Sequence, residues 1–284
     1  MDKTTIKELF MTFGIVNNVR ITKNQKLRYL TIIKKYFENI GFEKIDILKY
    51  KVIKKKSYFS VIGDIEKADY IVSTYYDTPV FNLLRQTYEP FNDDSRKSQN
   101  SINYILSMIL ITIIMLLATF FIILPIFQDG VFGFKDILAS LISISLLALI
   151  IKFSRVGGFP KVGNLIRNTS SVVAILKFAR LLSPNEQKRI AFAFVDYGCE
   201  DYLGYYALSK ELEKKRNQKI IFLDCVGAGN LSQSNTKSEI LTSYFKHSLF
   251  VYGDFKNEKK QDYEEGIEAS IKILINETSK KSKI

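Results

Sequence analysis

The chain has 284 residues, of which 47% are hydrophobic and 25% are charged. This length and composition suffice to bury a core and exclude an intrinsically disordered protein. Lys and Arg number 41 against 29 Asp and Glu, which gives a net charge of +12. A single His and two Cys argue against a disulfide framework and against a multi-His or Cys-rich zinc site.

The N-terminal region predicts one helix followed by three strands. Residues 24–41 carry apolar side chains at spacings of three and four, which is typical of an amphipathic helix, and Gly41 can end it. The β-like runs that follow are residues 45–52, 57–62 and 70–75. The last of them leads into the turn sequence Asp77-Thr78-Pro79.

A run of 31 residues without charge, 98–128, then indicates a membrane protein. Its apolar part, 104–124, is long enough to cross a bilayer as a helix, for which about 20 residues are needed. A second apolar stretch, 137–151, is shorter, and flanking residues can extend it to 134–153. We expect it to complete a transmembrane hairpin within residues 101–153, and a buried or re-entrant helix is the alternative.

The sidedness of the hairpin follows from its flanking cations. Lys and Arg lie close to both outer ends of the hairpin, whereas the connecting loop carries only Lys135. By the positive-inside rule, we expect a two-span protein of the cell membrane with residues 1–100 and 154–284 in the cytoplasm.

The region after the hairpin alternates helices with apolar strands, which favours a parallel α/β sheet. The expected helices are 172–182, 201–215 and 264–275, and the expected strands are 189–195, 219–223 and 244–252. Asn168-Thr169-Ser170 offers side chains that could cap the first of these helices at its N-terminus.

Four motifs stand in order along the two polar parts. They are Ser57–Gly63 with Ala68–Pro79, then Arg167–Leu182, Arg189–Gly204 and Ile220–Gly227. Together they resemble segments of the bi-zinc aminopeptidases, family twenty-eight of metallopeptidase clan MH, over roughly residues 55–79 and 160–230. The resemblance implies a three-layer α/β/α sandwich with a mixed, mostly parallel sheet that the hairpin interrupts. Strands on both sides of the hairpin would then join one sheet, which requires an even number of membrane crossings.

The resemblance also marks the positions at which that family binds zinc, and most of them carry other residues. The replaced positions are Tyr75 for the first His ligand, Arg167 for the bridging Asp, Gly198 for the catalytic Glu and Cys199 for the next Glu ligand. The residues kept are Asp77, which would orient the first ligand, and Asp224. A guanidinium cannot ligate a metal and repels one at short range, so we expect no bi-zinc centre and no catalytic residue.

Alternatives remain for these residues. Asp77, Cys199, Asp224 and His247 are the weak candidates for a single-metal site, and Cys199 with His247 could act as a thiol nucleophile and its base. Against these stand a buried cysteine and a surface histidine without a catalytic role. Arg167 could also pair with Asp77 or Asp224 and fill the vacated metal site.

The expected function is that of a membrane-anchored, aminopeptidase-like protein without peptidase activity. It would bind a peptide or a partner membrane protein in an accessory or regulatory role, with no cofactor. One alternative is a divergent metal-dependent hydrolase that uses Cys199 and Asp224, and another is a structural membrane subunit of a larger complex. The basic stretches Lys51–Lys56 and Lys214–Lys219 are interpreted as solvated or attracted to anionic lipid, not as nucleic-acid sites.

Overall fold

The computed structural model describes residues 5–52, 55–79, 88–120, 133–156, 161, 165–212, 218–228, 230–254 and 263–280. The chain divides into two compact units. The first unit comprises Met1–Pro79, Thr87–Lys97 and Val162–Ile284, and the second comprises Val80–Gln86 and Ser98–Lys161. The second unit is thus inserted into the first in sequence.

A sheet forms the centre of the first unit, with seven strands in the described residues in the order β1-β2-β4-β3-β5-β7-β6. The strands are β1 (Ile45–Val52), β2 (Lys55–Ile62), β3 (Tyr70–Tyr75), β4 (Ile190–Val195), β5 (Lys219–Asp224), β6 (Leu231–Ser234) and β7 (Ser248–Gly253). The pairs β3–β4, β3–β5 and β5–β7 are parallel and the other three are antiparallel. Strands from before and after the insertion therefore pair with one another in one mixed sheet.

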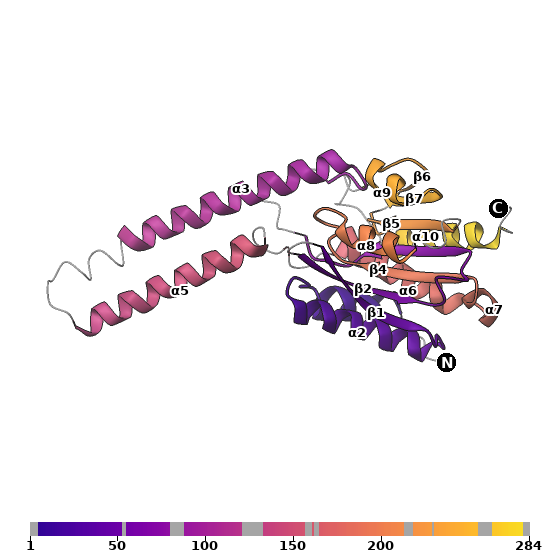
Figure 1. Ribbon diagram of the computed structural model, residues 1–284, viewed down its shortest axis with the longest axis horizontal. Helices are drawn as coiled ribbons and strands as arrows, with labels where there is room; N and C mark the ends of the chain where they lie inside the picture. Colours follow the sequence, from indigo (N-terminus) through magenta and orange to yellow (C-terminus); the bar gives the residue numbers. More distant parts are fainter. Residues whose placement is uncertain are drawn as a thin grey trace. The chain divides into compact units, whose positions relative to one another are not determined.

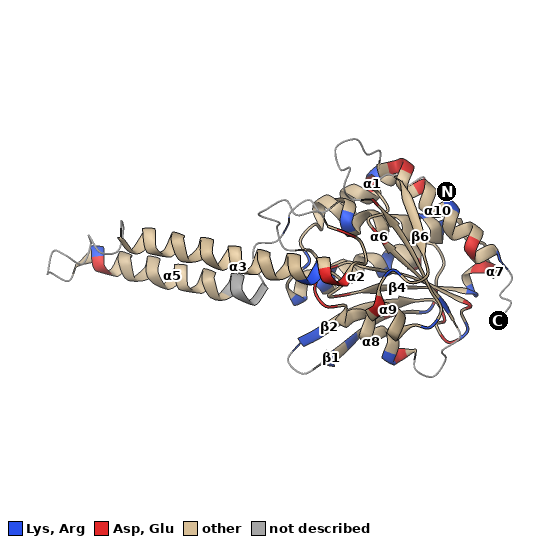
Figure 2. Cartoon of the chain, turned by 90° about the horizontal axis from the view of Figure 1, so that it is seen from above, with Lys and Arg blue, Asp and Glu red and all other residues tan. Residues whose placement is uncertain are grey.

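Helices cover both faces of this sheet. One face carries α1 (Ile6–Phe10), η1 (Met11–Val16), α2 (Lys23–Asn39), α6 (Ser170–Leu181) and α10 (Tyr263–Ser279). The other face carries α8 (Leu203–Glu211) and α9 (Glu239–Tyr244). Figure 2 shows α6 and α10 on one side of the strands and α8 and α9 on the other. The short elements η3 (Leu165–Thr169) and α7 (Pro184–Gln187) complete the unit.

Strand β4 shows how the sequence builds the two cores. All six of its residues are buried, as expected for a central strand covered on both faces. Its alternate side chains point to opposite faces, so Phe192 and Phe194 join the core under α2 and α6, while Ala191 and Ala193 join the core under α8. The predicted three-layer α/β/α sandwich with a mixed sheet is confirmed.

The second unit contains two apolar helices, α3 (Asp93–Ala118, which begins in the first unit) and α5 (Phe134–Val156). By length and composition, both are long and apolar enough to cross a membrane; the most apolar stretches within Asp93–Ala118 and Phe134–Ile151 have mean hydropathies of 2.3 and 2.1. Figure 1 shows α3 and α5 as two long helices. Figure 2, which marks charge by colour, shows no charged residue in the middle of either helix. The predicted stretch 134–153 lies within α5, whereas residues 121–124 of the predicted 104–124 lie outside the described residues.

Two local predictions were wrong. Asn168 and Thr169 do not cap a helix, because residues 165–169 continue helically into α6 and no side-chain cap bond forms there. The expected strand 244–252 begins only at Ser248, because Ser238 caps the short helix α9 through a hydrogen bond from the Leu241 amide to its Oγ. A polar N-cap immediately before a short apolar run was the missed signal.

Candidate functional site

The candidate site lies where parallel strands end. Tyr75 is the last residue of β3, Asp224 is the last residue of β5, and Asp196 directly follows β4. Carboxyl ends of neighbouring parallel strands meet at one edge of a sheet, which is where open α/β folds place their ligands. The predicted residues Tyr75, Asp77, Arg167, Cys199 and Asp224 are connected here by the contacts described below.

Asp224 forms the centre of a buried cluster. Its side chain is fully buried, the Tyr75 hydroxyl donates to Oδ1 at 2.7 Å, and the Tyr88 hydroxyl donates to Oδ2 at 2.6 Å. The Cys225 thiol contacts Oδ1 at 3.3 Å. Burial raises the pKa of Asp224, while the Arg167 charge and these hydrogen bonds oppose that rise. Both carboxylate oxygens are therefore satisfied by protein groups.

Arg167 supplies positive charge to the cluster. Its Nε donates to the Tyr75 hydroxyl at 3.3 Å, and its guanidinium lies 3.7 Å from the centre of the Tyr88 ring. A backbone hydrogen bond also links Arg167 to the end of β5, because the Cys225 amide donates to the Arg167 carbonyl. Arg167 thus contacts Tyr75 and Tyr88, and both of these tyrosines donate hydrogen bonds to the carboxylate of Asp224.

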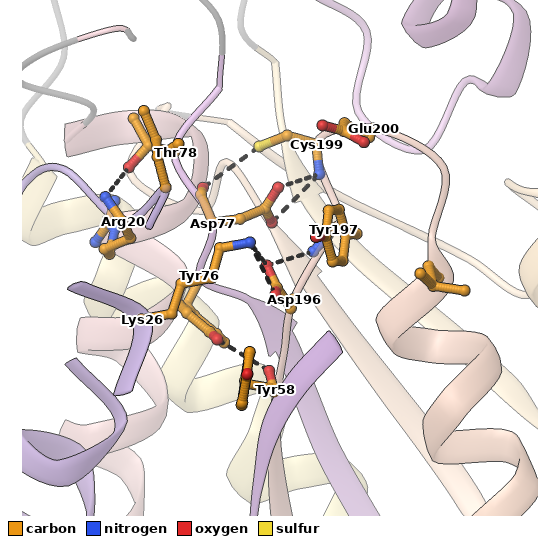
Figure 3. A network of polar contacts seen from close by, with 12 residues as sticks. Arg20, Lys26, Tyr58, Tyr76, Asp77, Thr78, Asp196, Tyr197, Cys199 and Glu200 are labelled. Carbon is orange, nitrogen blue, oxygen red and sulfur yellow. Dashed lines mark hydrogen bonds and ion pairs between the residues drawn. The ribbon is translucent and has the colours of Figure 1, made fainter. Parts of the chain in front are cut away.

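Asp77 holds the loop after β4 instead of facing Asp224. Its carboxylate accepts the amide hydrogen of Gly198 at 2.9 Å. It also accepts the amide hydrogen of Cys199 at 3.1 Å, and the Cys199 thiol points at the backbone carbonyl of Asp77 (Figure 3). The Asn168 side-chain amide donates to the same carbonyl. These hydrogen bonds satisfy the buried carboxylate of Asp77 without a metal ion and fix the loop after β4.

Gly198 stands where the resemblance places a catalytic Glu, and the structure leaves no room for a side chain there. A Cβ added at Gly198 would lie 2.1 Å from both Cβ and Cγ of Tyr75. Tyr75 therefore fills the space that a side chain at position 198 would need.

We expect Gly198→Ala to lower the unfolding free energy by about 1–3 kcal/mol, the usual cost of overpacking a filled core. Chemical denaturation of the detergent-solubilised protein measures the change. Glu200→Ala in the same loop is the control, because it removes a half-exposed contact to Lys55 and should cost about 0–1 kcal/mol. Equal stability of the two variants would contradict the packing described here.

A second buried pair, which the sequence did not predict, lies beside this loop. Lys26 Nζ of α2 contacts Asp196 at 2.7 Å from Oδ1 and 2.9 Å from Oδ2, and lies 4.1 Å from the centre of the Tyr197 ring (Figure 3). Asp196 is fully buried, and burial raises its pKa to about 7 despite the attraction of Lys26. Lys26 stands four and seven residues before the core residues Leu30 and Ile33, and this spacing was the available signal.

Two further arginines are buried at this end of the sheet. Arg20 donates to the Phe13 carbonyl and the Asn168 side chain, both at 3.1 Å. Arg96, near the start of α3, lies 3.3 Å from the centre of the Tyr202 ring. Each guanidinium is only 1% exposed. Buried cations thus stand around the site.

The structure does not bring His247 to the site. His247 is exposed and precedes β7, and its carbonyl accepts the Ile220 amide near the start of β5, whereas Asp224 lies at the other end of that strand. A pair of Cys199 and His247 is therefore excluded. Burial and the nearby Asp77 raise the pKa of the Cys199 thiol well above its ordinary value, which is the opposite of an activated nucleophile.

Zinc does not fit the residues present. Within the part of the chain that the structure describes, no three His, Cys, Asp or Glu side chains form a group that could hold a metal ion. The two oxygens of Asp224 accept tyrosine hydroxyls, those of Asp77 accept backbone amides, and Arg167 adds a fixed positive charge. A metal would have to displace all of these contacts.

No family model matches the chain, and no curated protein matches it. Solved structures do resemble it. Glutaminyl cyclase from Porphyromonas gingivalis has a TM-score of 0.56 at 10% identity, covering 97% of this chain and 98% of its own. A zinc-dependent exopeptidase from Parabacteroides distasonis has 0.53 at 11%, covering 97% and 98%. The LapA aminopeptidase from Legionella pneumophila has 0.51 at 11%, covering 97% and 71%.

These likenesses define the class of fold. The chain has the α/β fold that zinc-dependent exopeptidases, aminopeptidases and glutaminyl cyclases share, and the predicted aminopeptidase-like fold is confirmed.

Proposed function

We propose that this chain is a membrane-anchored, aminopeptidase-like protein that lacks peptidase activity and binds a peptide or a partner protein in an accessory or regulatory role. The carrying observation is the state of Asp224, whose two oxygens accept hydrogen bonds from Tyr75 and Tyr88 beside Arg167. In a hydrolase of this fold, a carboxylate at this position would have to be free to ligate zinc.

The chemistry of the replaced residues supports loss of hydrolysis. Metal-dependent peptide hydrolysis needs an ion that activates water and a carboxylate that takes the proton. Position 198 has no carboxylate and no space for one. The sequence resemblance assigns the bridging ligand to position 167, where the chain has an arginine whose Nε donates to Tyr75. The buried Cys199 thiol, with its raised pKa, does not replace either part.

Peptide or protein binding is proposed from the fold. The solved aminopeptidase and exopeptidase that share it act on peptide ends, and a fold that keeps its strand-edge architecture can keep a binding surface after losing catalysis. Photo-crosslinking from position 200, on the loop after β4, tests this binding in cells. A peptide or protein adduct should form from position 200. The control is position 181, which is exposed at the C-terminal end of α6 and should form no adduct.

Membrane anchoring is proposed for α3 and α5 as a two-helix hairpin. Their lengths and mean hydropathies support spanning, and side chains such as Leu116 (65% exposed) and Ile144 (64%) would be covered by lipid. Strands from both sides of the insertion pair in one sheet, so both flanking parts must share one side of the membrane. The Lys and Arg residues flanking the hairpin in the sequence favour the cytoplasmic side.

We expect the purified protein to contain far less than one zinc per chain and to cleave no aminoacyl arylamide or unblocked peptide, with or without added zinc. The reason is that its ligand positions are blocked by internal hydrogen bonds and by Arg167. Elemental analysis and a cleavage assay on the full chain in detergent measure both. Stoichiometric zinc together with cleavage that Asp224→Ala abolishes would overturn the proposal.

A further inference from the structure

The N-terminal segment Ile6–Val16, formed by α1 and η1, is apolar on two sides. Leu9 and Phe13 are buried against the sheet core. On the other side Met11, Ile15 and Val16 are 54%, 52% and 63% exposed. A surface helix normally turns polar residues outward. An apolar outer face therefore indicates a surface that is covered by a membrane or by another protein.

The loop that follows this segment is bonded to the point at which the chain leaves the first unit. The Thr78 hydroxyl donates to the Asn18 carbonyl at 3.0 Å, and the Arg20 amide donates to the Thr78 hydroxyl at 2.8 Å. Thr78 is followed by Pro79, the last residue before the inserted unit with the apolar helices. The loop that follows Val16 is thus bonded to the exit of the chain.

The same segment also packs against the point of return. A Cβ added at Gly14 would lie 2.6 Å from Cδ2 of Leu165 and 3.0 Å from Cγ2 of Thr169. Both residues belong to η3, the first helical element of the first unit after the insertion. Within the first unit, the segment Ile6–Val16 therefore contacts η3, which follows the return of the chain, and the loop after Val16 is bonded to the exit.

The charges around this face suit a lipid surface. Lys7 and Lys23 are exposed on either side of η1, and both can approach anionic headgroups. The one acidic residue of α1, Glu8, is used in a capping box with Thr5, where its carboxylate accepts the Thr5 amide. An apolar face flanked by lysines is the composition of an interfacial membrane helix.

We propose that Met11, Ile15 and Val16 insert into the headgroup–acyl boundary of the bilayer that α3 and α5 enter, so that the α/β unit contacts the membrane surface through η1. This inference rests on the proposed membrane anchoring. Its consequence is that the edge of the sheet carrying the Asp224 cluster is held close to lipid, because η3, which contacts η1, carries Arg167.

The chain has no Trp, so a single introduced Trp is a specific reporter. The full chain is reconstituted into vesicles of phosphatidylcholine and phosphatidylglycerol whose acyl chains carry bromine either near the headgroup or near the methyl end. V16W should lose emission mainly to the shallow bromines, because an interfacial helix lies roughly 5–10 Å into the boundary. L116W reports on the apolar helix and should lose emission to the deep bromines. L181W, 59% exposed at the far end of α6, should keep its emission.

The three reporters separate two failures. Quenching of L116W without quenching of V16W overturns the interfacial inference and leaves the anchoring intact. An unquenched L116W overturns the anchoring itself. A V16W emission that shifts to shorter wavelength without bromine quenching would mean that protein, such as a second copy, covers η1, and this also overturns the inference.

Discussion

Replacing Asp224 by Ala is expected to lower the unfolding free energy by about 3–5 kcal/mol, the cost of removing one member of a buried, charged network. The substitution leaves the Arg167 guanidinium buried without its anion, and it removes the acceptor of both the Tyr75 and Tyr88 hydroxyls. Chemical denaturation of the full chain in detergent, followed by far-ultraviolet circular dichroism, measures the loss.

Two controls show whether this loss comes from the network. Asp224→Leu combined with Arg167→Met replaces the charges by apolar groups of similar size, and this double variant should be more stable than Asp224→Ala. The stability of the unchanged protein should also be insensitive to a zinc chelator. A chelator that destabilises the protein as much as Asp224→Ala does would show instead that Asp224 holds a metal.

Much of the fold could be predicted because its signals are local. The strands at 45–52 and 70–75 have the predicted bounds, since apolar and β-branched runs between turn residues determine strands over a few positions. The gathering of Tyr75, Cys199 and Asp224 was also foreseeable. Each lies at or just after the carboxyl end of a parallel strand, so their association follows once the strands are placed.

The residues that complete the site could not be predicted in this way. Tyr88 lies outside the motifs and reaches Asp224 across 136 positions, and the pair of Lys26 and Asp196 is separated by 170. Such partners depend on how helices and loops pack on the sheet. Arg96 is a further example. In the sequence it is one of the Lys and Arg residues near the hairpin, but in the structure it is buried against Tyr202.

Replacing Lys26 by Met should have an effect of comparable size, about 3–5 kcal/mol above about pH 7, because the buried Asp196 then either stays ionised without its cation or has to take up a proton. Lys34→Met is the matched control on the same helix. Lys34 has an exposed contact with Glu38, so its loss should cost about 0–1 kcal/mol at any pH between about 5 and 8.

The pH dependence of the Lys26→Met effect identifies its cause. The pKa of Asp196 is about 7 in the folded protein and about 3.9 in an unfolded chain, so the folded state binds the extra proton between these values. The stability from this group is therefore full below about pH 4 and is lost as pH rises to about 7. Without Lys26 the pKa of Asp196 rises further, so the loss of stability extends above pH 7 and the cost of the substitution grows with pH above about 7. Adding Asp196→Asn to Lys26→Met should remove that growth. A cost that falls as pH rises, or that persists unchanged with Asn at position 196, would contradict a buried pair held together by charge.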